Sequence, residues 1–171
     1  RVEPFTDLLQ DSTKGHNILI TGAGGTIGRE IFSQIIKLNP NSVVLVESSE
    51  INLYNLEQEF YSFLKNNKNI YLKLGDVKNY NFNNKLLNKY KIDVIYHAAA
   101  YKHVPLIESN PLQGIENNVL STLAICKAAE SSRVKRVTLI SSDKAVRPTN
   151  VMGASKRLAE LVVKAFSNNP K

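Results

Sequence analysis

The stretch Thr21-Gly22-Ala23-Gly24-Gly25-Thr26-Ile27-Gly28 decides the fold of this chain of 171 residues. It follows a short apolar run at 17–21 and opens the segment 26–38, in which apolar residues recur at helical spacing. Glycine has no Cβ, so backbone N–H groups at the head of a helix can approach a phosphate, whose charge the helix dipole favours. The stretch therefore predicts a strand, a phosphate-binding turn and a helix.

The glycine spacing in this turn is Gly22-x-x-Gly25-x-x-Gly28. It departs from the common G-x-G-x-x-G pattern, because Ile27 stands where that pattern has its third glycine. The preceding strand and following helix favour a dinucleotide pyrophosphate as the ligand, and the alternative is a tight turn that binds nothing. The candidate cofactor-binding residues of the turn are Gly22, Gly24, Gly25, Thr26, Ile27 and Gly28.

The rest of the chain alternates between strand-like and helix-like patterns. Such alternation implies parallel βαβ units, and right-handed crossovers then give an α/β doubly wound parallel sheet of Rossmann type. Its ligand crevice lies at the carboxyl ends of the strands. Residues 1–15 lack a sustained period and are interpreted as a linker or arm, and 16–171 as the domain. Strands are expected at 17–21, 42–47, 69–75, 92–97 and 134–141, and helices at 26–38, 50–64, 80–90, 111–131 and 151–166.

Composition limits the partners of the chain. The net charge is +7, but the basic residues are scattered along the sequence without an aromatic-interleaved basic ribbon, so a solvated basic surface is favoured over nucleic-acid binding. Without a run of roughly 18 apolar residues, or a signal peptide, we expect no membrane contact by this segment. A single cysteine, Cys126, excludes an internal disulfide and fits a reducing, cytoplasmic compartment. Because the chain begins at Arg1, we expect it to be a piece of a longer protein.

Two acids end predicted strands. Glu47 lies 19 residues after Gly28, where a carboxylate accepts hydrogen bonds from the ribose hydroxyls of adenosine and repels a 2′-phosphate. NAD is therefore favoured over NADP, which remains the alternative. Asp76, followed by Val77, is placed to reach the adenine, or it caps the next turn.

Several longer motifs resemble the CapD-like polysaccharide-biosynthesis family of extended short-chain dehydrogenase/reductases. They are TGAGGTIG at 21–28, HAAAYKHVP at 97–105, Asn117-Asn118 and LISSDKAVRPTNVMGASK at 139–156. The segment RVEPFTDLL at 1–9 is similar to the one that follows the membrane region in long members. The parent is then expected to be membrane-anchored, with this segment as its cytoplasmic domain.

The resemblance implies a UDP-N-acetylglucosamine 4,6-dehydratase for polysaccharide or glycan biosynthesis. Its members transfer a hydride from sugar C4 to NAD, lose water across C5 and C6, and return the hydride to C6. The family continues with a substrate-binding lobe, so the chain corresponds to the cofactor half of a larger enzyme and is expected to be inactive alone. A UDP-sugar substrate and homo-oligomers are the expected partners. A sugar-nucleotide epimerase or reductase and a non-catalytic dinucleotide-binding module are the alternatives.

Match of position assigns the catalytic candidates Ser142, Asp143 and Lys144. Asp143 is the candidate acid for the C6 hydroxyl. Lys144 is the candidate base for C5, a role that requires a lowered pKa. The alternative is a surface ion pair in a loop, which contributes little to stability.

Met152 and Lys156 stand where the wider superfamily has Tyr-x-x-x-Lys. Their spacing of four places both side chains on one helical face. Lys156 is expected to bind the nicotinamide ribose. Met152 cannot transfer a proton, so the C4 base stays open among Ser142, Asp143 and Lys144.

The loop after the fourth predicted strand supplies further candidates. Ala98, Ala99 and Ala100 let the cofactor lie against the backbone, and Lys102 and His103 are candidates for substrate contact, with packing as the alternative for His103. Asn117 or Asn118 braces the active-site backbone, and Asn117 is counted among the cofactor-binding residues. No metal site is expected, because His97 and His103 have no cysteine or carboxylate at ligand spacing.

Overall fold

A five-stranded parallel sheet forms the centre of the computed structural model, which describes residues 6–168 and the side chains from Gln10 to Asn168. The strand order is β3-β2-β1-β4-β5, so the order reverses beside β1. The doubly wound Rossmann fold predicted from the sequence is thereby confirmed. The strands are β1 (Asn17–Thr21), β2 (Ser42–Glu47), β3 (Ile70–Leu74), β4 (Val94–His97) and β5 (Arg136–Leu139).

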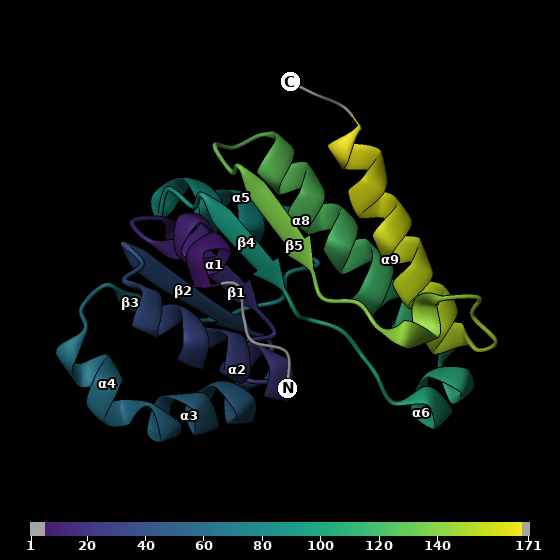
Figure 1. Ribbon diagram of the computed structural model, residues 1–171. Coiled ribbons are helices and arrows are strands. Elements are labelled where there is room, and N and C mark those ends of the chain that lie inside the picture. Colours follow the sequence, from purple (N-terminus) through teal and green to yellow (C-terminus); the bar gives the residue numbers. More distant parts are fainter. Residues whose placement is uncertain (1–5, 169–171) are drawn as a thin grey trace.

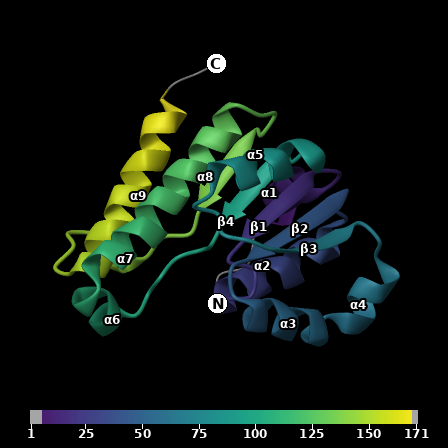
Figure 2. The ribbon, with the colours of Figure 1, turned by 180° about the vertical axis from the view of Figure 1, so that it is seen from behind.

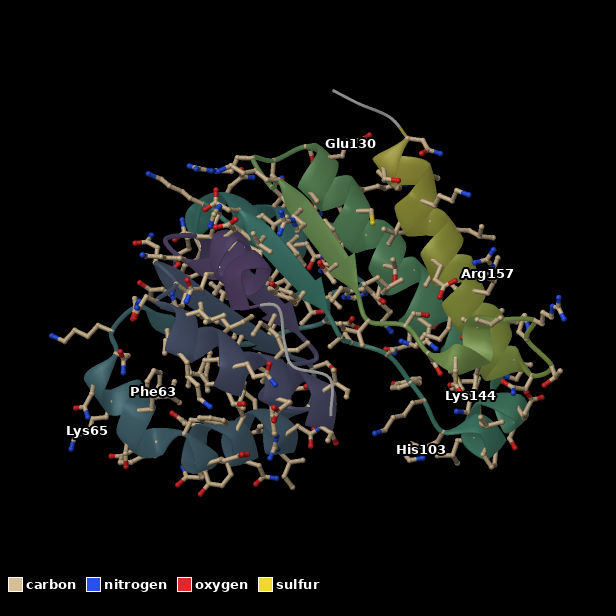
Figure 3. All side chains as sticks on the ribbon, viewed as in Figure 1. Phe63, Lys65, His103, Glu130, Lys144 and Arg157 are labelled. Carbon is tan, nitrogen blue, oxygen red and sulfur yellow. The ribbon has the colours of Figure 1, made fainter. Side chains whose placement is uncertain are left out.

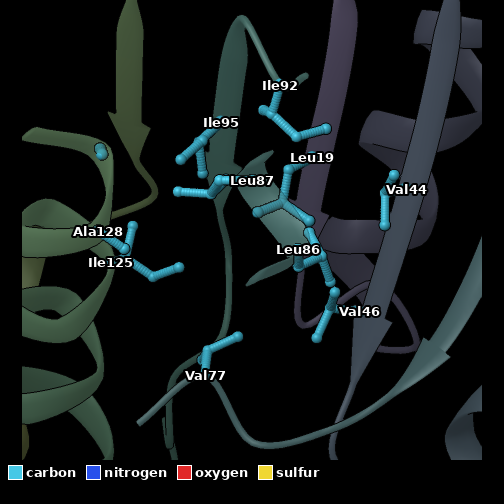
Figure 4. Packing of buried hydrophobic residues seen from close by; sticks show 11 residues of the cluster. Leu19, Val44, Val46, Val77, Leu86, Leu87, Ile92, Ile95, Ile125 and Ala128 are labelled. Atoms are coloured by element: carbon cyan, nitrogen blue, oxygen red, sulfur yellow. The ribbon is translucent and has the colours of Figure 1, made fainter. Parts of the chain in front are cut away.

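Helices cover both faces of this sheet (Figures 1 and 2). Alternate residues of β1 and β2 point to opposite faces, which is why these strands read as continuous apolar runs. On one face Ile18 and Ile20 pack with Phe32, and on the other Leu19 packs with Leu87 and Ile125 (Figure 4). The helices are α1 (Thr6–Thr13), α2 (Thr26–Ile35), α3 (Glu50–Glu59), α4 (Tyr61–Asn66), α5 (Tyr80–Lys89), α6 (Val104–Ser109), α7 (Pro111–Ile115), α8 (Ser121–Glu130) and α9 (Val151–Ser167).

Three short helical turns join these elements. The 3₁₀ turn η1 (Ile36–Leu38) ends α2, and the 3₁₀ turn η3 (Asp143–Ala145) follows β5. The π-helical turn η2 (Glu116–Leu120) lies between α7 and α8. Among residues 6–168, no helix is long and apolar enough to span a bilayer.

Several predicted elements need correction. The helix expected at 50–64 is two helices, because Phe60 leaves helical geometry where its ring packs 4.9 Å from that of Phe32. The helix expected at 111–131 is interrupted by η2, and α6 and η3 were not expected. The strands at 69–75, 92–97 and 134–141 are shorter than predicted.

The predicted arm at 1–15 contains a helix. Helix α1 covers Thr6–Thr13, and Thr13 is fully buried; a helix was not predicted in this stretch. A turn at Gly15 connects α1 to β1, and the Gly15 N–H donates to the Asn39 carbonyl. Residues 1–5 lie outside the described part of the chain.

Candidate active site

The glycine turn brings β1, the head of α2 and the loop after β4 into close contact. Gly22 has φ +66°, and a Cβ there would lie 2.7 Å from the Ala99 backbone. A Cβ on Gly28 would lie 2.2 Å from the Gly22 carbonyl. These approaches require glycine at both positions, and they set the first turn of α2 against the carboxyl end of β1.

The head of α2 carries backbone N–H groups without intrahelical acceptors, as every helix does. Its N-cap residue is Gly25, which has no side chain to cap them. Gly25, Thr26 and Ile27 are exposed, and the predicted glycine-turn residues thus surround an open helix end. This geometry fits the pyrophosphate of a dinucleotide.

A groove of about 340 Å³ runs from this turn across the carboxyl ends of the strands. It brings together most of the predicted cofactor residues, while Gly24 and Thr26 line an adjoining hollow beside α2. Six further lining residues were not predicted, although Tyr101 lies in the motif at 97–105. They are Val46, Ser48, Ser49, Asn52, Gly75 and Tyr101. The predicted residues that line the groove are Gly22, Gly25, Glu47, Asp76, Val77, Ala98, Ala99, Ala100 and Asn117.

Glu47 is buried at the end of β2 beside this groove. Its carboxylate accepts hydrogen bonds from the backbone N–H groups of Gly24 at 3.0 Å and Ser48 at 2.9 Å. The carboxylate is therefore fixed in position, and it joins the glycine turn to β2. Asp76 accepts from the Lys78 N–H at 2.9 Å, which is the turn-capping role foreseen as its alternative.

The buried amide of Asn118 holds the loop after β4. Its oxygen accepts from the Tyr101 N–H at 2.7 Å, and its nitrogen donates to the Tyr101 carbonyl at 3.1 Å and to Ser155 Oγ at 2.9 Å. The sequence did not decide which of the two asparagines braces this backbone, and these contacts assign the role to Asn118. Asn117 faces the groove. The π-helical turn η2 includes both residues.

Lys156 lies one helical turn after Met152 on α9, and both side chains are buried. Its ammonium donates to the Ile140 carbonyl at 2.9 Å, beside the end of β5. Burial lowers the pKa of Lys156, and Glu160 partly opposes that effect. Burial, and secondarily the charge of Lys156, lowers the pKa of His97 to about 3.

The Ser142-Asp143-Lys144 triplet follows β5 at the same edge of the sheet. Asp143 Oδ1 accepts from Ser142 Oγ at 2.9 Å and lies 3.3 Å from Lys144 Nζ. The side chains of Asp143 and Lys144 are 87% and 51% exposed. Hydrogen bonds from Ser142 and Lys144 lower the pKa of Asp143, so this carboxyl is ionised at neutral pH.

Helix α9 fixes the place of this triplet. Its N-cap, Asn150, accepts from the Gly153 N–H at 2.8 Å. A Cβ on Gly153 would lie 2.2 Å from the Lys144 carbonyl, so η3 packs directly on the head of α9. Gly153 is a site-forming residue that the sequence analysis missed.

Lys102 and His103 lie on the extended loop between β4 and α6, and both are exposed. They line a second hollow of about 470 Å³ with Leu106, Ile107 and Gln113. Figure 3 shows His103 and Lys144 at the same end of the molecule, on different segments. The predicted substrate residues thus stand next to the cofactor groove through Ala100 and Tyr101, which line both hollows.

The fold and groove define an extended short-chain dehydrogenase/reductase domain. The model of the polysaccharide biosynthesis protein family matches residues 18–171, and the chain belongs to that family.

Curated relatives are longer than this chain. The capsular polysaccharide biosynthesis protein CapD of Staphylococcus aureus is 39% identical over 168 residues, which are 98% of this chain and 28% of that protein. An uncharacterized membrane protein of Methanocaldococcus jannaschii is 40% identical over 86% of this chain and 42% of its own length. A UDP-glucose 4-epimerase of Rickettsia bellii is 35% identical over 84% of this chain and 41% of its own. The chain thus spans less than half of each.

Solved structures agree with the fold. Pen from Bacillus thuringiensis superposes with a TM-score of 0.85 at 35% identity, over 92% of this chain and 48% of that one. A dTDP-glucose 4,6-dehydratase from Streptomyces venezuelae, solved with NAD bound, gives a TM-score of 0.79 at 22% identity over 89% of this chain and 52% of its own. At that identity the second likeness concerns the fold alone.

Proposed function

We propose that this chain is the NAD-binding part of a nucleotide-sugar 4,6-dehydratase that acts on UDP-N-acetylglucosamine in polysaccharide or glycan biosynthesis. The observation that carries the proposal is the groove, which joins the open head of α2, Glu47 and the Ala98–Ala100 loop at one edge of the sheet. The Asp143–Lys144 pair and Lys156 follow β5 at that same edge. Membership in the family and the relatives above support the substrate class.

NAD is the proposed cofactor because Glu47 is held in place beside the groove. A 2′-phosphate would approach a fixed carboxylate there, and like charges repel. The Arg29 guanidinium does not relieve this repulsion, because its Nε donates to the Gly24 carbonyl at 2.8 Å and its other end pairs with Glu59 at 2.9 Å.

When bound, the dinucleotide would serve as the acceptor of the hydride from C4 and later as its donor to C6. Lys156 would orient the nicotinamide ribose. Lys144 would take the C5 proton, and Asp143 would give a proton to the departing C6 hydroxyl, so that one water leaves. Lys144 would then return a proton to C5 as the hydride adds at C6, which gives the 4-keto-6-deoxy sugar. Met152 transfers no proton, and Ser142, Asp143 or Lys144 would deprotonate the C4 hydroxyl.

The acid role of Asp143 needs a change of environment. In this chain the carboxyl is exposed and its pKa is lowered, whereas an acid must hold its proton at the working pH. Covering Asp143 with sugar and with the rest of the parent protein would raise its pKa by removing water. This requirement explains why we expect no turnover by the chain alone.

The proposal is tested by incubating the full-length parent with UDP-N-acetylglucosamine and following the product by NMR. A 4-keto-6-deoxy sugar formed without an external hydride donor supports it. The likeness to UDP-glucose 4-epimerases makes epimerisation the second candidate, and a product inverted at C4 that keeps its C6 hydroxyl would establish that activity instead. Turnover unchanged in Asp143→Asn would remove the acid assignment.

A further inference from the structure

We propose that the edge of the sheet where the strands begin docks on an anionic lipid bilayer. The parallel strands all start at this edge (Figure 1). The residues that line the groove lie at or after the carboxyl ends of the strands, which is the opposite edge. Exposed lysines and arginines gather here from the last turns of helices, from the connections that lead into the strands and from the start of β5. This basic edge consists of Lys14, Lys37, Lys65, Lys68, Lys89, Lys91, Lys127, Arg133, Lys135, Arg136 and Lys164.

The basic edge carries almost no balancing acid. Among the side chains from Gln10 to Asn168, three acids accompany these eleven cations, which leaves a charge of +8. The three acids are Asp11, Asp93 and Glu130. Asp93 is buried, where it lies 3.2 Å from Arg133 and 3.3 Å from Lys135 and accepts from the Asn17 N–H at 3.1 Å.

The opposite edge has a different balance. Nine acids and seven cations lie on the segments that follow the strands, at the groove edge, so this edge is slightly negative. The positive charge of the molecule is therefore concentrated at one end. The acids are Glu30, Glu47, Glu50, Glu59, Asp76, Glu108, Glu116, Asp143 and Glu160, and the cations are Arg29, Lys78, Lys102, Lys144, Arg147, Lys156 and Arg157.

Helix stabilisation explains only part of this asymmetry. Cations in the last turn of a helix complement its dipole, and helices of this fold end at the basic edge. Five of the eleven cations occupy such last turns. The other six, which are Lys14, Lys68, Lys91, Arg133, Lys135 and Arg136, lie in connections or at the start of β5.

The arrangement fits a bilayer better than a nucleic acid. The cations spread across the ends of five strands, a width of about 20 Å at the usual strand spacing. Nine of the eleven are lysines, which are strongly hydrated point charges on flexible stems, whereas arginine forks suit phosphate recognition at fixed positions. Lysine residues near an anionic membrane each contribute attraction without a shaped pocket. Lys65, for example, extends from α4 into solvent (Figure 3).

Docking through the basic edge would leave the groove facing away from the membrane and open to a dissolved sugar nucleotide. The inference goes beyond the proposed function and does not depend on it. It revises our expectation that this segment makes no membrane contact. Cations that are scattered along the sequence come together only when the parallel strands bring their starting ends to one edge.

Vesicle co-sedimentation tests the proposal. The chain is mixed with phosphatidylcholine vesicles that contain either no anionic lipid or about 30% phosphatidylserine, at low and at raised salt. The test variant carries Lys14→Glu, Lys68→Glu and Arg136→Glu. The control variant carries Lys78→Glu, Lys85→Glu and Arg157→Glu, which changes the net charge equally but leaves the basic edge intact.

We expect the unmodified chain and the control variant to sediment with anionic vesicles only, and to be released by salt. The bound-to-free ratio of the test variant falls at least tenfold, while its NAD⁺ affinity measured by calorimetry is unchanged. Equal loss in both variants, or no binding to anionic vesicles by the unmodified chain, overturns the proposal. So does displacement of the chain from vesicles by a DNA duplex at equal phosphate concentration, which would assign the basic edge to nucleic acid.

Discussion

At the scale of single residues, Glu47 has two separable roles. Its carboxylate accepts from the Gly24 and Ser48 amides, and it faces the position proposed for the adenosine ribose. Glu47→Ala removes both the ribose acceptor and the charge that repels a 2′-phosphate. We expect the preference for NAD⁺ over NADP⁺, measured by calorimetric titration of both, to fall at least about tenfold, the effect of roughly 1.4 kcal/mol.

Glu47→Gln separates those roles further. The amide keeps one acceptor oxygen, but its NH₂ group meets a backbone N–H that needs an acceptor, and an unsatisfied buried donor costs about 1–3 kcal/mol. Urea unfolding measures that loss. An unchanged cofactor preference in both variants would show that Glu47 only stabilises the glycine turn.

His97 is the residue whose burial makes stability depend on pH. Its imidazole lies 2.6 Å from Thr21 Oγ1 and 3.2 Å from Thr122 Oγ1, and burial holds its pKa at about 3. The folded state thus binds fewer protons than the unfolded state between that value and the ordinary 6.5. Stability contributed by neutral His97 is complete above pH 6.5 and falls by about 1.4 kcal/mol per unit as the pH drops below it.

Urea unfolding at pH 7 and pH 5 of the chain and of His97→Gln measures this effect. We expect the free energy of unfolding of the unmodified chain to fall by about 2 kcal/mol more than that of the variant over this interval. The comparison stops at pH 5 because Asp93 and Glu160 have lowered pKa values. Protonation of these carboxylates at lower pH would reduce the stability of the fold further. Parallel slopes in the two proteins would mean that His97 is charged in the fold.

At the scale of elements, the two adjacent asparagines of the π-helical turn η2 have different roles: Asn118 holds the backbone at Tyr101, and Asn117 faces the groove. Asn118→Ala removes the partners of the Tyr101 N–H and carbonyl and of Ser155. We expect it to lower the free energy of unfolding by about 2–4 kcal/mol, because buried backbone groups lose their hydrogen bonds. Asn117→Ala is the matched control, since it faces the groove and should reduce NAD⁺ affinity with little loss of stability. Equal destabilisation by both changes would contradict this division.

The contact of α9 with η3 makes a second prediction at this scale. Gly153→Ala would raise helix propensity by about 1 kcal/mol, but its Cβ would lie 2.2 Å from the Lys144 carbonyl. We expect net destabilisation of about 1–3 kcal/mol and, in the full-length parent, loss of turnover as Asp143 and Lys144 shift. Ala154→Ser, one residue further along α9, serves as the control. A stabilised Gly153→Ala would mean that η3 moves freely relative to α9.

The elements also show which local rules can be read from sequence. The bounds of β1 and β2 match the prediction, because buried β-branched runs with turn residues on both sides leave one interpretation. The break at Phe60 arises from its packing on Phe32, and η2 contains the asparagine that binds Tyr101 and Ser155, all distant in sequence. The exposed pair of Asp143 and Lys144 matches the surface ion pair that the sequence offered as an alternative, and only the fold distinguishes it from a buried pair. Motif spacing thus identified many of the residues that line the groove, whereas the contacts among them required the fold.

For the molecule as a whole, the decisive feature is that the described residues form the complete groove. The groove is built from β1 to β4 and their connections, all of which lie within residues 6–168. We therefore expect residues 6–168 to bind the dinucleotide by themselves. A ligand that binds only the folded state raises the free energy of unfolding by mass action. We expect NAD⁺ at about 100 times its dissociation constant to raise the free energy of unfolding by about 2.7 kcal/mol, measured by thermal unfolding against ligand concentration.

The same titration with UDP-N-acetylglucosamine shows whether the chain also binds the proposed substrate. The hollow beside Lys102 and His103 is open, and both side chains are exposed, so these residues alone offer the sugar nucleotide few buried contacts. We expect no shift in the melting temperature with the sugar nucleotide and a clear shift with NAD⁺. A shift with the sugar nucleotide as large as that with NAD⁺ would place the substrate site within this chain, and Asp143 would then have to be covered by substrate alone.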